Sequence, residues 1–189
     1  MPTPDRFSRL APFYDRLFQP RQKDPLHEVI GLPIPGRLLD AGGGTGRIAQ
    51  SLVALAEQVV VADLSFRMLG EAIRKDGLRG VNAHSEHLPF AEGEFERVIM
   101  VDAMHHVSDQ AQTARELYRV LAPGGRLVIE EPNLHHWAVK LIALGENLAL
   151  MHSHFLSPPQ IADLFRAVSV EARLVQRGAT AYVVVEKPA

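Results

Sequence analysis

Short apolar runs alternate with helical patterns along most of the chain, and this alternation predicts the order of its elements. Runs rich in Val, Ile and Leu predict strands over 37–41, 58–62, 81–84, 95–101 and 126–129. Apolar residues at helical spacing predict helices over 47–56, 65–76 and 108–121. Pro123-Gly124 is typical of a type II turn and leads into the fifth strand. A helix that opens at Ser157 and extends to about residue 167 precedes two further strands over 170–176 and 181–186.

The order of these elements predicts the fold class. Strands that alternate with helices form a parallel sheet covered on both faces. The last two strands are too close in sequence for a crossover helix, so they form an antiparallel hairpin. We therefore predict an α/β fold with an open, doubly wound, seven-stranded and mostly parallel sheet whose last strand is antiparallel.

Two segments do not fit this alternation. Residues 7–30 carry Phe7, Leu10, Tyr14, Leu17 and Phe18 on one helical face, and residues 135–154 are inserted after the fifth strand. Both can be core-packing helices or covers over a ligand cleft at the carboxyl edge of the sheet. We expect one domain over 1–189, with N-terminal lid helices over 1–30 and a helical cap insertion over 134–156. The apolar side chains of the cap can shape an acceptor pocket or a dimer interface, so a monomer and a homodimer both stay open.

Composition narrows the classes of protein and partner. The 189 residues are 47% hydrophobic and 22% charged, which is ordinary for a globular domain. The net charge of −2 predicts neither nucleic acid nor an anionic membrane as a partner. Without cysteine there is no disulfide and no thiol catalysis. We see no signal peptide and no transmembrane segment, and expect a cytoplasmic protein.

A glycine-rich loop between the first strand and its helix carries the strongest chemical signal. Glycines at 42, 44 and 46 allow a tight turn and close approach of a ligand to the backbone, but they do not match G-x-G-x-x-G, and no P-loop lysine follows. Asp40, just before the loop, is suited to a cationic group rather than to a pyrophosphate. Asp63, at the end of the second strand, stands where a carboxylate binds two ribose hydroxyls. A nucleoside with an amino-acid-like cation meets both requirements, and S-adenosylmethionine is such a molecule.

Five sequence blocks in order support this interpretation: LLDAGGGTGRIA at 38–49, VVVADLSFRML at 59–69, SEHLPF at 85–90, FERVIMVDAMHHV at 95–107 and LYRVLAPGGRLVIEEP at 117–132. With them the chain resembles the class I S-adenosylmethionine-dependent methyltransferases, in the small-molecule branch that includes the ubiquinone/menaquinone C-methyltransferases. The resemblance implies a Rossmann-like fold, S-adenosyl-L-methionine as the cofactor, S-adenosyl-L-homocysteine as its product and a small, partly apolar acceptor.

The same resemblance implies a set of cofactor-binding residues. Asp40 with the Gly42 and Gly44 backbone would hold the methionine end, Asp63 the ribose, and Leu64 and Met68 the adenosine. The backbone at Val101 and Asp102 would meet the methionine moiety, and Tyr14 would lie over it. Where the family often has Asp to accept a hydrogen bond from adenine, this chain has His84 followed by Ser85. A neutral histidine can accept that bond and a cationic one cannot, so we keep His84 and Ser85 as adenine candidates.

The candidates for proton transfer follow strands four and five. His105 and His106 are the candidate general bases, with Glu131 a weaker one, and purely positional catalysis is the alternative. His135, His136, His152 and His154 lack a carboxylate at a recognisable ligand spacing, so we predict no metal. Besides the methyltransferase, the sequence leaves open a non-catalytic S-adenosylmethionine-binding or regulatory protein on the same fold. A nicotinamide-dependent oxidoreductase is the third possibility, although its loop spacing does not match.

Overall fold

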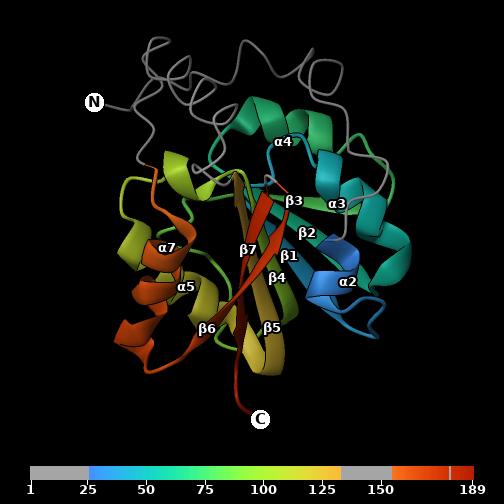
Figure 1. Ribbon diagram of the computed structural model, residues 1–189. Coiled ribbons are helices and arrows are strands. Elements are labelled where there is room, and N and C mark those ends of the chain that lie inside the picture. The colour runs from blue at the N-terminus through green and yellow to red at the C-terminus, as the bar shows by residue number, and fades with distance from the viewer. Residues whose placement is uncertain (1–25, 133–154, 179) are drawn as a thin grey trace.

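A seven-stranded mixed sheet forms the centre of the molecule (Figure 1). The computed structural model describes residues 26–132, 155–178 and 180–189. The strands are β1 (Arg37–Ala41), β2 (Gln58–Asp63), β3 (Leu78–Asn82), β4 (Phe95–Val101), β5 (Leu121–Pro132), β6 (Ala172–Arg177) and β7 (Thr180–Glu186). Their order across the sheet is β3-β2-β1-β4-β5-β7-β6, and β7 runs antiparallel to both of its neighbours. The predicted doubly wound α/β fold is confirmed.

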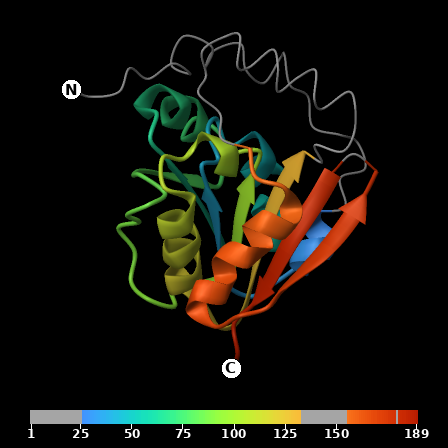
Figure 2. The same cartoon turned by 60° about the vertical axis from the view of Figure 1, so that its left-hand side comes forward.

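Helices cover both faces of this sheet. They are α2 (Leu26–Ile30), α3 (Arg47–Leu52), α4 (Phe66–Ala72), α5 (Gln110–Val120) and α7 (Pro158–Leu164), with 3-10 turns η2 (Val53–Leu55), η3 (Met104–His106) and η4 (Phe165–Val168). Helices α2, α3 and α4 pack on one face, while α5 and α7 lie on the other (Figure 2). The sequence places a start signal at three of them. Before α4, the Ser65 hydroxyl accepts the Met68 N–H at 3.4 Å. The Asp109 carboxylate accepts the Gln112 N–H at 2.8 Å before α5, and the Gln160 side chain accepts the Ser157 N–H at 2.8 Å before α7.

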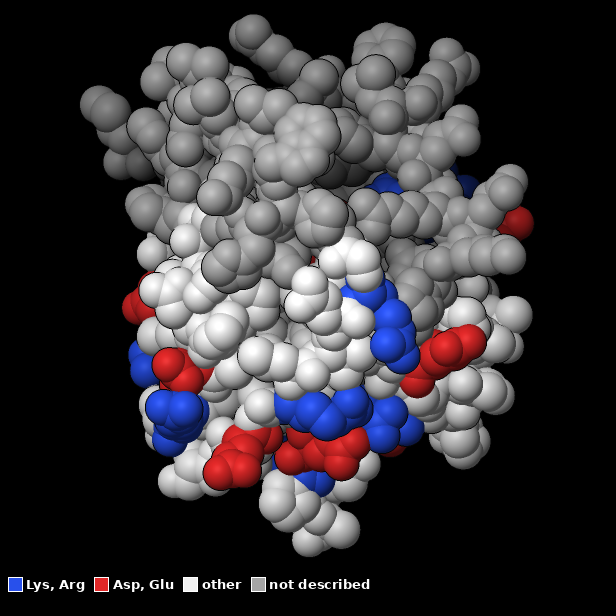
Figure 3. Space-filling view, viewed as in Figure 1, with Lys and Arg blue, Asp and Glu red and all other residues white. Residues whose placement is uncertain are grey.

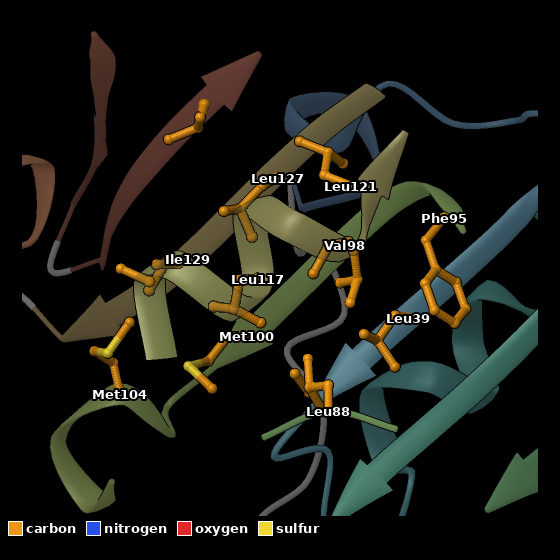
Figure 4. Packing of buried hydrophobic residues seen from close by; sticks show 14 of the residues in the cluster. Leu39, Leu88, Phe95, Val98, Met100, Met104, Leu117, Leu121, Leu127 and Ile129 are labelled. Atoms are coloured by element: carbon orange, nitrogen blue, oxygen red, sulfur yellow. The ribbon is translucent and has the colours of Figure 1, made fainter. Parts of the chain in front are cut away.

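The core is divided between the two faces because successive side chains of a strand point to opposite sides. In β4, Val98 and Met100 join the cluster under α5, while Ile99 joins the cluster under α2 and α3. Figure 4 shows the first cluster, in which side chains of three strands meet Leu117 of α5. Strands buried on both faces explain the near-continuous apolar runs in the sequence.

Three predicted elements have clearly different bounds in the structure. Helix α4 ends at Ala72 rather than near residue 76, because the chain turns toward β3 through Gly77 at φ +82°. The edge strand β3 begins three residues early, at Leu78, which is its one buried residue. Strand β5 begins at Leu121, because Leu121 already pairs with Phe95 before a register shift brings Arg126 opposite Arg97. The Pro123-Gly124 turn therefore lies inside β5 as an irregularity, with Gly124 at the expected positive φ of 73°.

Charged side chains are mixed on the described surface. Basic and acidic groups lie beside one another on the face shown in Figure 3. Arg126 pairs with Glu186 at 2.8 Å, and Arg166 pairs with Asp163 at 3.1 Å. Within the described ranges, no helix is long and apolar enough to cross a membrane.

Candidate functional site

The candidate site lies at the carboxyl ends of β1, β2, β4 and β5. The chain leaves β1 for β2 and β3 on one side, and β4 returns to the other side of β1. Open α/β sheets bind ligands at such a change of direction, because the loops after the two central strands diverge there. The glycine loop follows β1 and the two histidines follow β4, so both flank this point.

The glycine loop at 42–46 is held by backbone bonds and by close packing. Gly42 N–H donates to the Ala62 carbonyl at 2.7 Å, and Gly46 N–H donates to the Gly43 carbonyl at 2.8 Å. Gly42 has φ +72°, and a Cβ there would lie 2.8 Å from the Cβ of Ala103. A side chain at 42 is therefore excluded by both conformation and space. The same contact places the loop directly against the segment that leads from β4 to the histidines.

The Asp63 carboxylate is fixed between two backbone donors. Gly44 N–H donates to its Oδ2 at 2.8 Å, and Ser65 N–H donates to its Oδ1 at 2.7 Å. Asn82 donates from Nδ2 to the carbonyl of Asp63 at 2.9 Å, which holds the end of β2 against β3. A carboxylate oxygen has two lone-pair positions and can accept more than one hydrogen bond. The two backbone bonds fix the orientation of this half-buried carboxylate at the end of β2.

Asp40 is in the opposite state. Its residue is 1% exposed, and neither carboxylate oxygen has a hydrogen-bond partner among the described residues. A Cβ on Gly43 would lie 2.5 Å from the Asp40 Cγ, so the carboxyl group sits directly under the glycine loop. Burial, and then the charge of Asp63, raise its pKa to about 7, while Arg47 and the nearby Ala49 N–H, which does not reach hydrogen-bond geometry, act in the other direction. A cation at the loop would favour the ionised form and offset this cost.

A second buried carboxylate lies across the site, at the end of β5. Glu131 Oε2 is 2.6 Å from His105 Nδ1, and Glu131 Oε1 accepts the Met104 N–H at 2.8 Å. Both side chains are 5% exposed. The Phe155 ring stacks on the His105 ring at 4.3 Å between centroids, with 15° between the planes. The structure therefore joins two of the residues that the sequence proposed separately.

His106 differs from its neighbour. Its ring lies 4.0 Å from that of His105 and is tilted by 53°. Burial, and then the nearby His105, lower its pKa to about 4, so His106 is neutral at physiological pH. The two adjacent histidines consequently have different electrostatic surroundings.

Comparison with known proteins agrees with this geometry. Residues 39–129, from β1 to the end of the apolar run in β5, match the family described as "Methyltransferase domain". Residues 39–129 are thus similar to a methyltransferase domain. The chain is 37% identical over 139 residues to the demethylmenaquinone methyltransferase of Thermus thermophilus, covering 66% of this chain and 63% of that protein. It is also 37% identical over 105 residues to the ubiquinone/menaquinone biosynthesis C-methyltransferase UbiE of Haemophilus ducreyi, covering 50% of this chain and 40% of that protein. The chain thus spans less than two thirds of the length of either relative.

Solved structures share the fold. A Thermotoga maritima structure described as an S-adenosylmethionine-dependent methyltransferase, possibly a histamine N-methyltransferase, has a TM-score of 0.79 at 22% identity. The alignment covers 96% of this chain and 98% of that one. A methyltransferase from Haloferax volcanii, solved with the Trm112 activator, has a TM-score of 0.82 at 16% identity, over 99% and 100% of the two chains. The predicted resemblance to class I methyltransferases is confirmed by these matches.

The remaining predicted site residues within 39–129 lie at or after the ends of β2, β3 and β4, and they differ in exposure. Leu64 is 54% exposed beside Asp63, whereas the Met68 side chain is buried on the inner face of α4. His84 is exposed, with Nδ1 3.9 Å from Glu86 Oε2, and Ser85 follows it half-buried. Val101 ends β4, and Asp102 turns the chain with φ +50° while its N–H donates to the Glu130 carbonyl at 2.9 Å.

Several predictions fall outside the described residues. These are Tyr14, most of the N-terminal lid over 1–30, nearly all of the cap over 134–156, and the histidines at 135, 136, 152 and 154. In the part of the chain that the structure describes, no group of three or more histidine and acidic side chains is arranged to hold a metal.

Sequence reasoning missed two aromatic residues near the candidate site. Phe155 stacks on His105, and Phe66, one residue after the Ser65 cap of α4, is 78% exposed. An exposed aromatic side chain beside Asp63 could have been suspected, because Phe66 lies outside the buried helical stripe formed by Met68, Leu69 and Ala72. Nothing in the sequence pattern signals the contact of Phe155 with His105.

Proposed function

We propose that this chain is an S-adenosylmethionine-dependent methyltransferase that moves a methyl group to a small, partly apolar acceptor. The observation that carries the proposal is the pair of aspartates at adjacent strand ends. Asp63 is prepared to accept two hydroxyl groups, and Asp40 is a buried carboxylate without a hydrogen-bond partner in the described structure. S-adenosylmethionine carries a ribose and an ammonium group, so one molecule would place hydroxyl groups at Asp63 and a cation near Asp40.

The residues present fit this cofactor. Asp63 would accept from the ribose hydroxyls, and Asp40 would provide negative charge near the ammonium group. Gly42 and Gly44 would let the methionine end approach the backbone, because neither residue carries a side chain. When bound, the cofactor supplies a methyl group on a positively charged sulfur, which is an activated leaving group.

The rim residues complete the proposed site. Leu64 and Met68 would give apolar surface to the adenosine, while His84 or Ser85 would meet the adenine. The backbone at Val101 and Asp102 would line the methionine moiety, with Tyr14 over it. Catalysis by positioning and exclusion of water would be assisted by His105 or His106 wherever the acceptor must lose a proton.

The acceptor is proposed from the relatives. The names of the Thermus and Haemophilus proteins refer to demethylmenaquinone and to ubiquinone/menaquinone biosynthesis. A reduced, short-chain demethylmenaquinone is therefore the first acceptor to test. We propose a cytoplasmic monomer or homodimer, with no nucleic acid as a partner.

Calorimetric titration tests the cofactor directly. S-adenosylmethionine and S-adenosylhomocysteine should bind with micromolar affinity, and NADH, as the control, should not. Transfer of labelled methyl to the reduced quinone would then establish the enzyme. Binding without transfer to any acceptor would favour a regulatory S-adenosylmethionine-binding protein, and no binding of either compound would overturn the proposal.

A further inference from the structure

In the buried pair of His105 and Glu131, the carboxylate binds a backbone N–H as well as the imidazole. Both oxygens of one carboxylate are used, one by the imidazole at 2.6 Å and one by the Met104 N–H at 2.8 Å. Glu131 comes from the end of β5, and the other two residues form the start of η3, after β4. The carboxylate therefore fixes the position of η3 as well as the plane of the imidazole.

This arrangement selects one tautomer of His105. A backbone N–H can only donate, so Glu131 Oε1 must accept from Met104. An ionised carboxylate has no proton to give, so its Oε2 must accept a proton carried by His105 Nδ1. The neutral imidazole then has its lone pair on Nε2, and that nitrogen is the one that can accept a proton. The stacked Phe155 ring further restricts rotation of the imidazole.

The pair also lies on the cofactor side of the domain. Ala103 is the residue before η3. A Cβ placed on Gly42 would lie 2.8 Å from the Cβ of Ala103. The glycine loop and the segment that leads to His105 are thus in contact at the carboxyl end of the sheet. A base on this segment would lie on the side of the sheet where the proposed cofactor binds.

We propose that Glu131 is a positioning residue that holds His105 as the proton acceptor of the methyl transfer, and that the acceptor is consequently a weak acid such as an aromatic hydroxyl. The inference rests on the proposed function. In the reaction, a bond forms between the acceptor atom and the methyl carbon, and the bond between that carbon and sulfur breaks. Sulfur keeps the electron pair and becomes a neutral thioether, while the acceptor proton moves to His105 Nε2. Glu131 stabilises the imidazolium that results.

The competing interpretation is a buried pair that only stabilises the fold. Glu116 is a matched control for that role, because its Oε2 also accepts a backbone N–H, from Leu88 at 2.9 Å, and it also pairs with a cation, Arg119. Glu116 lies on α5 and is not part of the proposed site. If Glu131 were structural in the same sense, Glu131→Gln and Glu116→Gln would have the same effects.

The experiment compares Glu131→Gln, His105→Asn and Glu116→Gln with the wild type. Glutamine at 131 can keep the Met104 bond through its oxygen, but its NH₂ group then faces His105 Nδ1 and favours the tautomer with the proton on Nε2. Two readouts are used besides folding by circular dichroism. Long-range ¹H–¹⁵N NMR reports the tautomer of His105, and labelled methyl transfer is measured from pH 5 to 9 on phenols, the reduced quinone, tertiary amines and thioethers.

We expect the Nδ1–H tautomer in the wild type and in Glu116→Gln, and the Nε2–H tautomer in Glu131→Gln. Methyl should pass to the weak acids and not to amines or thioethers that have no proton to lose. Glu131→Gln and His105→Asn should lower kcat by about a hundredfold or more, with calorimetric affinity for S-adenosylmethionine unchanged. Glu116→Gln should keep wild-type turnover.

Other results would overturn the proposal. These are an Nε2–H tautomer in the wild type, equal transfer to thioethers or tertiary amines, or full activity of His105→Asn with loss of turnover in His106→Asn instead. Cofactor binding without methylation of any weak acid also counts against it. A wild type that does not bind S-adenosylmethionine would instead refute the proposed function, so the two failures can be distinguished.

Discussion

Asp40 and Glu131 are both buried carboxylates at the ends of central strands, yet the structure treats them in opposite ways. Asp40 has no hydrogen-bond partner among the described residues, and its pKa is raised to about 7. Glu131 uses one oxygen for a backbone N–H and the other for an imidazole. Burial of a carboxylate without partners costs free energy, whereas a satisfied one holds its neighbours in place. In the proposed function, the β1 end would therefore receive a cation from outside, whereas both oxygens of Glu131 already have partners within the protein.

The largest expected effect is on the cofactor side. Asp63→Ala should weaken S-adenosylmethionine binding by at least about a hundredfold, because two hydroxyl groups lose a charged acceptor and the Gly44 and Ser65 N–H groups lose theirs. Calorimetry measures this change. The control is Asp76→Ala, an exposed aspartate in the turn before β3. If Asp63→Ala binds S-adenosylmethionine within threefold of the wild-type affinity, Asp63 does not bind the ribose. The contrast between a cofactor-binding β1 end and the β5 end would then lose its basis.

Asp40 and Glu131 should also differ in the sign of their effect on stability. The folded-state pKa of Asp40 is about 7, against an ordinary value of 3.8, so the folded protein binds more protons than the unfolded chain between these values. The free energy of unfolding therefore falls as pH rises from about 4 to 7. Asp40→Asn removes this loss and should stabilise the protein at pH 8, by on the order of 2–4 kcal/mol. Glu131→Gln should destabilise it, by about 1–3 kcal/mol. Urea unfolding at pH 5 and pH 8 tests both signs.

The same carboxyl group should make cofactor binding depend on pH. Binding of a cation favours ionised Asp40, so affinity for S-adenosylmethionine should fall by up to about tenfold per pH unit below pH 7. Asp40→Asn should bind more weakly at pH 8 and lose most of this dependence. An unchanged pH dependence in Asp40→Asn would assign the effect to another group, of which His84 is the first to examine.

The contact between the glycine loop and Ala103 should have a smaller effect on the free energy of unfolding. Gly42→Ala adds a methyl group against Ala103 in a left-handed conformation, and should cost about 1–3 kcal/mol and impair cofactor binding. Gly124→Ala is the matched control, since Gly124 has φ +73° and nothing within 4 Å of an added Cβ. Its free energy of unfolding should fall by about 1 kcal/mol because of backbone strain alone, and its affinity for S-adenosylmethionine should be that of the wild type. Equal binding by the two variants would show that the contact of the loop with Ala103 does not matter for the site.

The smallest expected effect is at the adenine. His84 is exposed, so a hydrogen bond that it accepts from adenine would contribute about 0.5–1.5 kcal/mol. His84→Ala should weaken S-adenosylmethionine binding by less than about tenfold in a calorimetric titration at pH 8. A larger loss would show that His84 contributes more to cofactor affinity than a single exposed hydrogen bond.

The sequence predicts the cofactor side better than the acceptor side, and the reason is the range of the interactions. Asp40, Asp63 and the glycines belong to motifs whose spacing is set by one strand and one turn, and β1 and β4 have the predicted bounds. The pairing of His105 with Glu131 spans 26 residues and depends on two side-chain rotamers. Topology predicts that the ends of β4 and β5 are neighbours, but not that a carboxylate shares its oxygens between an imidazole and a backbone N–H.

The boundary errors have a similar cause. Strand β3 lies at the sheet edge with exposed residues in its middle, so its sequence lacks the apolar run that identifies β1 and β2. In β5, a turn dipeptide is accommodated inside a strand because Leu121 pairs with Phe95 ahead of the irregularity. Local sequence patterns identify the turn at Pro123-Gly124, whereas the start of β5 is defined by pairing with Phe95, more than twenty residues away.

The position of β7 has a consequence for how the chain is made. Among the described strands β7 is synthesised last, yet it lies between β5 and β6 and pairs with both. Until it emerges from the ribosome, β5 presents an unpaired edge along the apolar run Leu127–Ile129. Such an edge is a template for association with other chains, and the charged Arg126, Glu130 and Glu131 that flank it are residues of the kind that limit aggregation. A nascent chain stalled before Thr180 should therefore be the form that most needs a chaperone.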